Sequence, residues 1–217
     1  MNVDVAFLIA DLSGYTALTE AHGGAHAAKV VARYAEVAAA ALRPGARLVE
    51  EIGDQLLIVA AEAAVAVETA LGLREAVERE PLFPTLRSGI HAGSALEEGG
   101  RYYGRTLNLA ARVAAHARAG QILCTARVAT RVGRLGSVAF QPLGEVRFKG
   151  IVEPVAVFEV AGGREPAELA AIDPVCRMQV RPEVAPARLP YRGVVYYFCS
   201  FECARAFAAR PESYAGG

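Results

Sequence analysis

Two carboxylates stand where strand-like segments of this sequence end. Asp11 follows the apolar run "FLIA", and Asp54 lies in the turn of "EEIGDQLLIV". Carboxylates on adjacent strand ends can hold one or two hard cations such as Mg²⁺, which proteins bind through few carboxylates together with substrate phosphates. The small residues Ser13 and Gly14 leave backbone amides free at a helix start, where phosphate oxygens can bind. The alternative is that Asp11 only caps that helix.

Asn108 and Arg112 are spaced i, i+4 in "GRTLNLAARVAAHAR", so they share one face of the predicted helix. An amide and a guanidinium presented together could orient a sugar oxygen and stabilise charge that grows on phosphorus. Each of these features is weak alone. Together with the two carboxylates they indicate a metal-dependent phosphoryl-transfer site.

The segments that position these side chains alternate between strand-like and helix-like patterns. Gly53 and Asp54 form the predicted turn of a hairpin, and Pro44 with Gly45 ends a helix. Strands are expected over 5–12, 46–60 (as that hairpin), 84–96, 121–128, 138–148 and 152–161, and helices over 24–42, 60–80 and 104–118. This order predicts an α+β fold in which helices pack on a largely antiparallel sheet.

The composition is that of a well-packed globular protein: 53% of the 217 residues are hydrophobic, 21% are charged, and the formal net charge is zero. Because lysine and arginine are not in excess, we expect no nucleic-acid partner. The first ten residues lack the basic region of a signal peptide, and no apolar run approaches the roughly 20 residues that span a bilayer. We therefore expect a cytoplasmic protein with no membrane partner.

The four cysteines are unevenly distributed. Cys124 lies in the apolar strand "GQILCTA" and is expected to be a small core residue. Cys176, Cys199 and Cys203 fall in the short C-terminal region, and clustered cysteines in a reducing cytosol suggest metal or redox chemistry. Three thiolates suit a soft metal such as Zn²⁺ or Cu(I). The alternative is that they are simply buried as apolar residues.

No histidine receives a chemical role. His91 lies on a predicted strand and is expected to pack as a structural residue, and His22, His26 and His116 lie on or beside helices at no ligand spacing. Three cysteines therefore leave a four-coordinate zinc site one ligand short.

Five motifs of the chain resemble the class III nucleotidyl cyclase catalytic domain in order and approximate spacing. They are "FLIADLSGYTALTE", "EEIGDQLLIV", "RSGIHAGSA", "YYGRTLNLAARV" and "LGEVRFKGIVEPVAVFEV". The resemblance implies a ferredoxin-like core, and a homodimer with its sites at the interface. It also implies that a nucleoside triphosphate is converted into a 3′,5′-cyclic nucleotide and pyrophosphate.

The same resemblance implies the metal-binding residues. Asp11 and Asp54 would bind two Mg²⁺ or Mn²⁺ ions, helped by the Leu12 carbonyl. One ion would activate the ribose 3′-hydroxyl and the other the triphosphate, which gives in-line attack on the α-phosphorus. On this reading Asp11 is a metal ligand and not a helix cap.

Further roles follow from the resemblance for residues that contact the nucleotide. Asn108 and Arg112 of the partner subunit would hold the ribose and the transition-state phosphate. Lys149 in "FKG" would contact the triphosphate, in addition to the phosphate-binding amides expected at Ser13 and Gly14 from the residues themselves.

The match to the family breaks at the two base-specifying positions. Members that use ATP carry a lysine four residues before the second metal aspartate, and an aspartate seven residues before the asparagine. This chain has Glu50 and Arg101 there. Glu50 is the guanylyl cyclase residue, whereas Arg101 fits neither class. The pair could suit guanine or cytosine, or Glu50 and Arg101 could pair with each other and read the base poorly. A catalytically silent nucleotide- or metal-binding regulator is the alternative function.

The segment 172–214 resembles the YHS domain, a short relative of the metal-binding TRASH domain, through "DPVC", "YYFCS" and "PESY". We therefore divide the chain into a cyclase domain (1–160), a linker (161–171) and a YHS domain (172–217). The resemblance implies that Cys176, Cys199 and Cys203 bind a metal such as Zn²⁺ or Cu(I). Because the two domains share one chain, we hypothesise that metal or redox state at the YHS domain modulates the cyclase.

Overall fold

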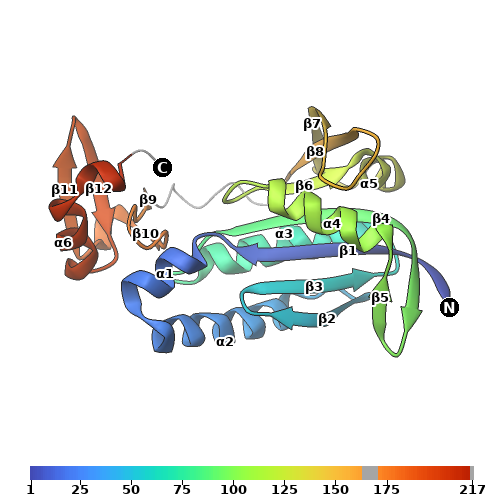
Figure 1. Cartoon of the computed structure of the whole chain (residues 1–217), viewed down its shortest axis with the longest axis horizontal. Helices are drawn as coiled ribbons and strands as arrows, with labels where there is room; N and C mark the ends of the chain where they lie inside the picture. Colours follow the sequence, from blue (N-terminus) through green and yellow to red (C-terminus); the bar gives the residue numbers. More distant parts are fainter. Residues whose placement is uncertain (163–170, 216–217) are drawn as a thin grey trace.

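The protein is described by a computed structural model over residues 1–162 and 171–215 (Figure 1). Over 1–162, eight strands form one sheet in the order β2–β3–β1–β4–β6–β8–β7, with β5 beside β4. The strands are β1 (Asn2–Leu12), β2 (Ala46–Ile52), β3 (Gln55–Ala60), β4 (Leu86–Glu98), β5 (Arg101–Tyr103), β6 (Ile122–Thr125), β7 (Ala139–Val146) and β8 (Val155–Ala161). Neighbouring strands are antiparallel except β4 and β6.

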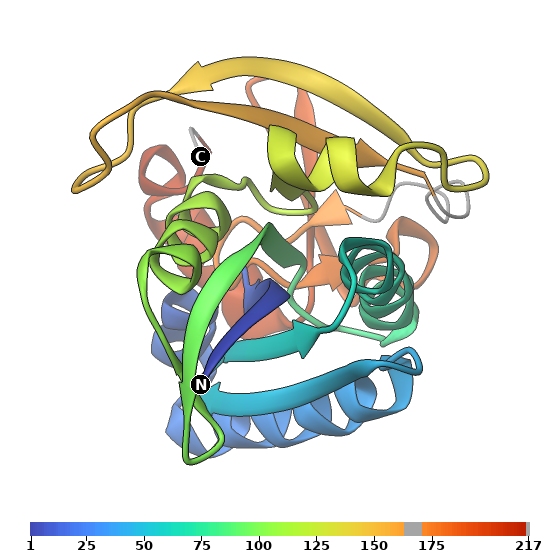
Figure 2. The same ribbon diagram turned by 90° about the vertical axis from the view of Figure 1, so that its right-hand side faces the viewer.

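Helices cover both faces of this sheet. The helices are α1 (Tyr15–His22), α2 (Gly24–Ala41), α3 (Ala63–Arg79), α4 (Arg105–His116) and α5 (Ala126–Val132). Leu8 on β1 belongs to the buried cluster that includes residues of α2 and α3, whereas Phe7 belongs to the cluster that includes residues of α4. Figure 2 shows α3 and α4 on opposite sides of β1 and β4. Burial on both faces explains why β1 is a continuous apolar run.

Close packing of α4 on the sheet depends on a glycine. A Cβ atom at Gly89 on β4 would lie 2.1 Å from the Ala114 backbone nitrogen of α4. No side chain fits there, so the helix approaches β4 through this position. This contact sets the distance between α4 and the sheet. It thereby also sets the positions of Asn108 and Arg112 on α4.

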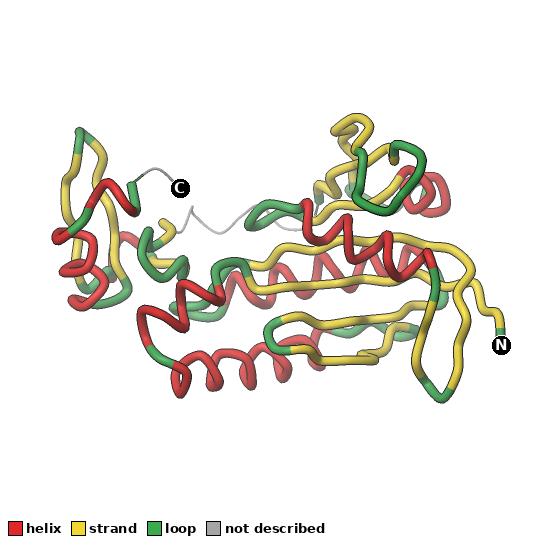
Figure 3. Tube along the Cα trace, viewed as in Figure 1, coloured by secondary structure: helices red, strands yellow, loops and turns green. Residues whose placement is uncertain are grey.

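The predicted α+β class is confirmed, and the elements differ from the expected ranges mainly at their ends (Figure 3). The expected strand 121–128 is wrong after Thr125, because Thr125 keeps an extended backbone and α5 begins at the next residue. The expected linker (161–171) falls largely on 163–170, outside the described residues. No helix among the described ranges is long and apolar enough to cross a membrane.

The C-terminal unit packs against the end of the sheet at which β1 finishes. Its elements are β9 (Ala171–Ile172), β10 (Gln179–Val180), the 3₁₀ helix Pro182–Val184, β11 (Ala187–Tyr191), β12 (Val194–Phe198), α6 (Phe201–Ala209) and the 3₁₀ helix Pro211–Ser213. Phe207 of α6 stacks on Tyr196 and Phe198 in its core. The Gln179 N–H donates to the Phe83 carbonyl at 2.9 Å. Figure 1 shows β9 and β10 beside α1, and one buried cluster spans the two units.

Candidate functional site

The two carboxylates singled out from the sequence meet at one edge of the sheet. Asp11 pairs in register with Gln55, the first residue of β3, and the Leu12 N–H donates to the Asp54 carbonyl at 3.3 Å. Burial, followed by the negative charge of Asp11, raises the pKa of Asp54 to about 6. A carboxylate whose ionisation is opposed by burial and by a neighbouring carboxylate is a site that a bound cation stabilises.

Two buried hydroxyl groups beside this edge have no hydrogen-bond partner among the described residues. They are Tyr34 Oη on α2 and Ser13 Oγ. Burial, and then the charges of Asp11 and Asp54, raise the pKa of Tyr34 well above its usual value. An unpartnered buried hydroxyl is costly unless a ligand or water completes it. A metal ion bound here would bring further oxygen ligands, which would give these two hydroxyl groups hydrogen-bond partners.

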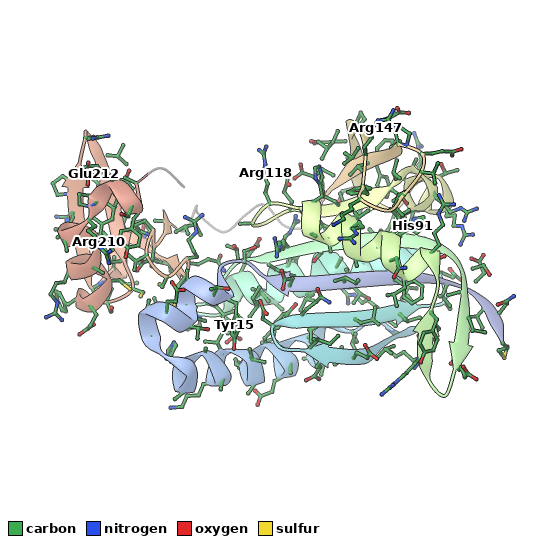
Figure 4. The ribbon with its side chains drawn as sticks, viewed as in Figure 1. Tyr15, His91, Arg118, Arg147, Arg210 and Glu212 are labelled. Atoms are coloured by element: carbon green, nitrogen blue, oxygen red, sulfur yellow. The ribbon has the colours of Figure 1, made fainter. Side chains whose placement is uncertain are left out.

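Asp11 is not a helix cap. Helix α1 begins at Tyr15, its N-cap is Gly14, and no side chain makes a capping hydrogen bond there. The Ser13 N–H donates to the Thr85 carbonyl at 2.7 Å, so the predicted free amide is not found at Ser13. Gly14 has φ 90° and shapes the turn into α1. Figure 4 labels Tyr15, where this loop enters the helix.

Arg87 is a third charged residue of the site, and the sequence reasoning missed it. It lies opposite Asp11 on β4, and its Nε donates to Asp11 Oδ2 at 2.6 Å. The Asp11 side chain is 15% exposed and that of Arg87 37%. The only available signal was an arginine near the start of the strand "LRSGIHAG". The site therefore contains one fixed cation beside two carboxylates.

The predicted catalytic pair lies on the outer surface of α4. Asn108 and Arg112 are exposed, while Leu109 and Val113, the residues that directly follow them, are buried against the sheet. Among the described residues, no hydrogen bond or ion pair joins either side chain to Asp11 or Asp54. One chain therefore presents the pair outward, separately from its own carboxylates.

Two of the remaining nucleotide-contacting candidates also face solvent. Lys149 is exposed in the turn after β7, and Arg101 is exposed at the start of β5. Glu50 is half-buried and follows a β-bulge in β2. Within the described ranges no ion pair joins Glu50 and Arg101, so mutual pairing is not found.

His91 on β4 packs beneath α4 and α5 (Figure 4). Its Nδ1 lies 2.8 Å from the Thr125 hydroxyl. Burial, and then the positive charges of Arg127, Arg131 and Arg105, lower the pKa of His91 to about 4. This packing agrees with the structural role that the sequence predicted for His91.

The three C-terminal cysteines converge on one point. Cys176, Cys199 and Cys203 are buried, with Sγ–Sγ distances of 3.4 Å between Cys176 and Cys199 and 3.7 Å between Cys199 and Cys203. Cys199 lies between β12, which ends at Phe198, and α6, which begins at Phe201, whereas Cys203 is on α6. Hydrogen bonds from the other two thiols lower the pKa of Cys203, whereas the thiol contacts raise that of Cys176. The cluster therefore favours one thiolate.

The prediction that no histidine completes this cluster is wrong. His22, the last residue of α1, places its Nε2 3.4 Å from Cys199 Sγ and 3.6 Å from Cys203 Sγ. One ligand atom from each of the four residues lies within 4.8 Å of all the others. Sequence spacing could not show this, because His22 belongs to the other domain.

Asp173 is a further residue that the sequence reasoning missed. Its carboxylate is fully buried and accepts the N–H groups of Val175 and Cys199 at 2.8 Å and that of Cys176 at 3.4 Å. It thereby joins the two segments that carry the first two thiols. Its only signal was its place in "DPVC".

Comparison with known proteins agrees with both parts of this architecture. Residues 2–161 match the model of the adenylate and guanylate cyclase catalytic domain, and 171–217 match the YHS domain. The chain is 32% identical over 164 residues to the pH-sensitive adenylate cyclase MT1302 of Mycobacterium tuberculosis, a match that covers 74% of this chain. It is 31% identical over 163 residues to an adenylate cyclase of Glutamicibacter nicotianae, covering 75%. The chain spans only 41% and 38% of the lengths of these relatives.

Solved structures show the same fold. The adenylyl cyclase CyaB from P. aeruginosa superposes with a TM-score of 0.66 at 21% identity, over 77% of this chain and 98% of that one. An adenylate/guanylate cyclase/hydrolase from Silicibacter pomeroyi gives 0.62 at 27% identity, over 76% of this chain and 99% of that one. From the matched family models, this chain belongs to the adenylate and guanylate cyclase catalytic-domain family and carries a YHS domain after the cyclase domain.

Proposed function

We propose that the chain is a nucleotidyl cyclase that converts a nucleoside triphosphate into a 3′,5′-cyclic nucleotide and pyrophosphate. The observation that carries this proposal is the meeting of Asp11 and Asp54 at one sheet edge, where Asp54 has a raised pKa. Adenylate cyclase relatives and the family match support the same reaction.

The carboxylates and their surroundings fit two divalent cations. Asp11, Asp54 and the Leu12 carbonyl would hold Mg²⁺ or Mn²⁺, which supplies Lewis acidity for the attacking 3′-hydroxyl and for the triphosphate. Arg87 already neutralises part of the charge on Asp11 and would stay beside the phosphates. Gly14 and the first turn of α1 lie next to this edge, where a helix N-terminus favours anions.

The separation of the catalytic groups supports a homodimer. The carboxylates lie at a sheet edge, whereas Asn108 and Arg112 face outward on α4, so one chain does not assemble the site by itself. In a symmetric dimer, Asn108 and Arg112 of the partner subunit would orient the ribose and stabilise charge on the α-phosphate. Lys149 would bind the triphosphate. Ile52, 61% exposed beside Asp54, and Val152, 88% exposed near Lys149, are apolar surface that such an interface would cover.

Base selection would rest on Glu50 and Arg101. No hydrogen bond or ion pair occupies either side chain within the described residues, so both are available to a base. Glu50 offers an acceptor and Arg101 a donor.

A cyclase assay with ATP, GTP, CTP and UTP, in Mg²⁺ and in Mn²⁺, tests the proposal. We expect cyclic product that Asp54→Asn abolishes and that Glu51→Gln, the exposed neighbour on β2, leaves unchanged. Nucleotide binding without product from any triphosphate would contradict the proposal and favour a regulatory nucleotide-binding protein.

A further inference from the structure

The C-terminal thiol cluster includes a side chain from the cyclase domain. His22 is the only one of its four members that comes from outside residues 176–203. It is half-buried at the end of α1, and its Nε2 points at two sulfur atoms and not at solvent. A histidine in this position supplies a nitrogen atom as the fourth ligand that three thiolates lack for a four-coordinate metal site.

The spacing of the ligand atoms matches a tetrahedral zinc shell. Zn–S bonds of about 2.3 Å and Zn–N bonds of about 2.0 Å put neighbouring sulfur atoms about 3.8 Å apart, and nitrogen about 3.6 Å from sulfur. The cluster has sulfur–sulfur distances of 3.4 and 3.7 Å and nitrogen–sulfur distances of 3.4 and 3.6 Å. These four distances lie within about 0.4 Å of the tetrahedral values, and the two remaining distances, from Cys176 to Cys203 and to His22, are at most 4.8 Å.

The backbone around the cluster is already held in place. Asp173 fixes the segments of Cys176 and Cys199 through their N–H groups. The Ser200 hydroxyl accepts the Cys203 N–H at 3.2 Å and caps α6. Such supporting contacts orient ligands before a metal arrives.

We propose that Cys176, Cys199, Cys203 and His22 form a Zn²⁺ site that fastens the YHS domain to helix α1 of the cyclase domain. The fourth ligand makes this an interdomain site, so occupancy adds a bond between the two domains. A mixed thiolate and imidazole set with four ligands selects Zn²⁺ over Cu(I).

The fastened helix leads directly to the catalytic loop. Helix α1 starts at Tyr15, after Ser13 and Gly14, and ends at His22. On the same side, Arg177 of the YHS domain packs over Gly14, where a Cβ atom would lie 2.4 Å from Arg177 Cβ. Zinc would therefore hold the C-terminal end of α1 against the YHS domain, while Arg177 contacts the loop at the other end of the helix. The consequence for catalysis rests on the proposed cyclase function, whereas the zinc site does not.

Zinc and cobalt titrations of the full chain, reduced and stripped of metal, test the site. We expect one Zn²⁺ per chain, and a tetrahedral Co²⁺ spectrum with thiolate-to-cobalt charge transfer. His22→Asn should weaken Zn²⁺ binding at least about tenfold, as even the loss of a supporting contact does, and should shift the cobalt d–d bands. His26→Asn is the matched control: its ring centroid lies 5.2 Å from that of His22, outside the ligand set. His26→Asn should change neither the Zn²⁺ affinity nor the cobalt d–d bands.

Amide hydrogen exchange then tests whether zinc holds α1 against the YHS domain. Zn²⁺ should slow amide exchange across α1 in the wild type and in His26→Asn, but not in His22→Asn. Equal affinity and an unchanged cobalt spectrum in His22→Asn would overturn the proposal, and so would a reduced chain that binds no zinc. Cyclase activity is a separate readout: a chain that binds zinc in this way but makes no cyclic nucleotide contradicts only the proposed function.

Discussion

Arg87 and Asp11 lie directly opposite each other on β4 and β1, and the guanidinium donates to Asp11 Oδ2 at 2.6 Å. The positive charge of Arg87 also lowers the pKa of Asp54, against the larger effect of burial. Arg87 thus stabilises the charges of two adjacent, partly buried carboxylates when no cation is bound. Removing it should make the protein depend on divalent ions for stability.

We expect Arg87→Met to lower the free energy of unfolding by about 1–2 kcal/mol, less than for a fully buried pair because Arg87 is partly exposed. Mg²⁺ or Mn²⁺ should restore more stability in this variant than in the wild type, since the ions bind the folded state. Thermal unfolding with and without the ions measures both effects. Arg33→Met, which breaks exposed pairs with Glu36 and Glu80, is the control and should show no ion-dependent rescue. The same ion response in both variants would contradict this role of Arg87.

Gly14 joins the loop before α1 to the YHS domain through a close contact with Arg177. Gly14→Ala should destabilise the protein more than Gly120→Ala. The two positions have similar left-handed φ values of 90° and 83°, but only a Cβ at Gly14 meets a neighbour, Arg177. Each substitution costs about 1 kcal/mol because alanine disfavours a left-handed backbone conformation. The difference in stability between the two variants therefore reflects the contact with Arg177.

The double variant Gly14→Ala with Arg177→Gly should recover that difference, because it removes the Cβ atom of Arg177, which itself has φ 66°. Urea unfolding of the four chains forms a double-mutant cycle. Strictly additive effects would show that the two residues do not touch in solution.

His91 should make stability depend on pH in acid. Its pKa is lowered from 6.5 to about 4 in the folded protein, chiefly by burial. Between these values the unfolded chain binds a proton that the folded protein does not, so the free energy of unfolding falls as the pH falls from 6.5 to 4. The loss is on the order of 2–3 kcal/mol.

Chemical unfolding of the wild type and of His91→Gln at several pH values separates this contribution from others. The variant should lose the part of the slope that lies between pH 4 and 6.5. An unchanged slope would show that His91 is protonated alike in the folded and unfolded states.

Much of the cyclase fold follows from local pattern. The apolar run of β1 and the Gly53–Asp54 turn each reflect short-range chemistry, so the sequence predicted where Asp11 and Asp54 would meet. The end of β6 was mispredicted, since "TARV" is apolar enough for either a strand or a helix, and tertiary packing selects α5.

The residues that were missed depend on contacts between distant segments. Arg87 owes its role to strand register with Asp11, and His22 owes its role to the docking of another domain. The spacing of residues along the sequence reveals neither relationship. Ser13 was expected to offer a free amide, but the carbonyl of Thr85, the residue before β4, accepts its N–H.

Complementation between inactive variants tests the central claim most directly. Asp54→Asn and Asn108→Ala should each be inactive alone, because each removes one half of a site built from two chains. Mixed in equal amounts and allowed to exchange subunits, they should regain about a quarter of the wild-type cyclase activity, since half of the dimers then hold one intact site of two. Recovery of cyclic nucleotide synthesis in the mixture is the predicted result. Activity in Asn108→Ala alone, or a mixture as inactive as its components although subunits exchange, would contradict a catalytic site shared between two copies of this chain.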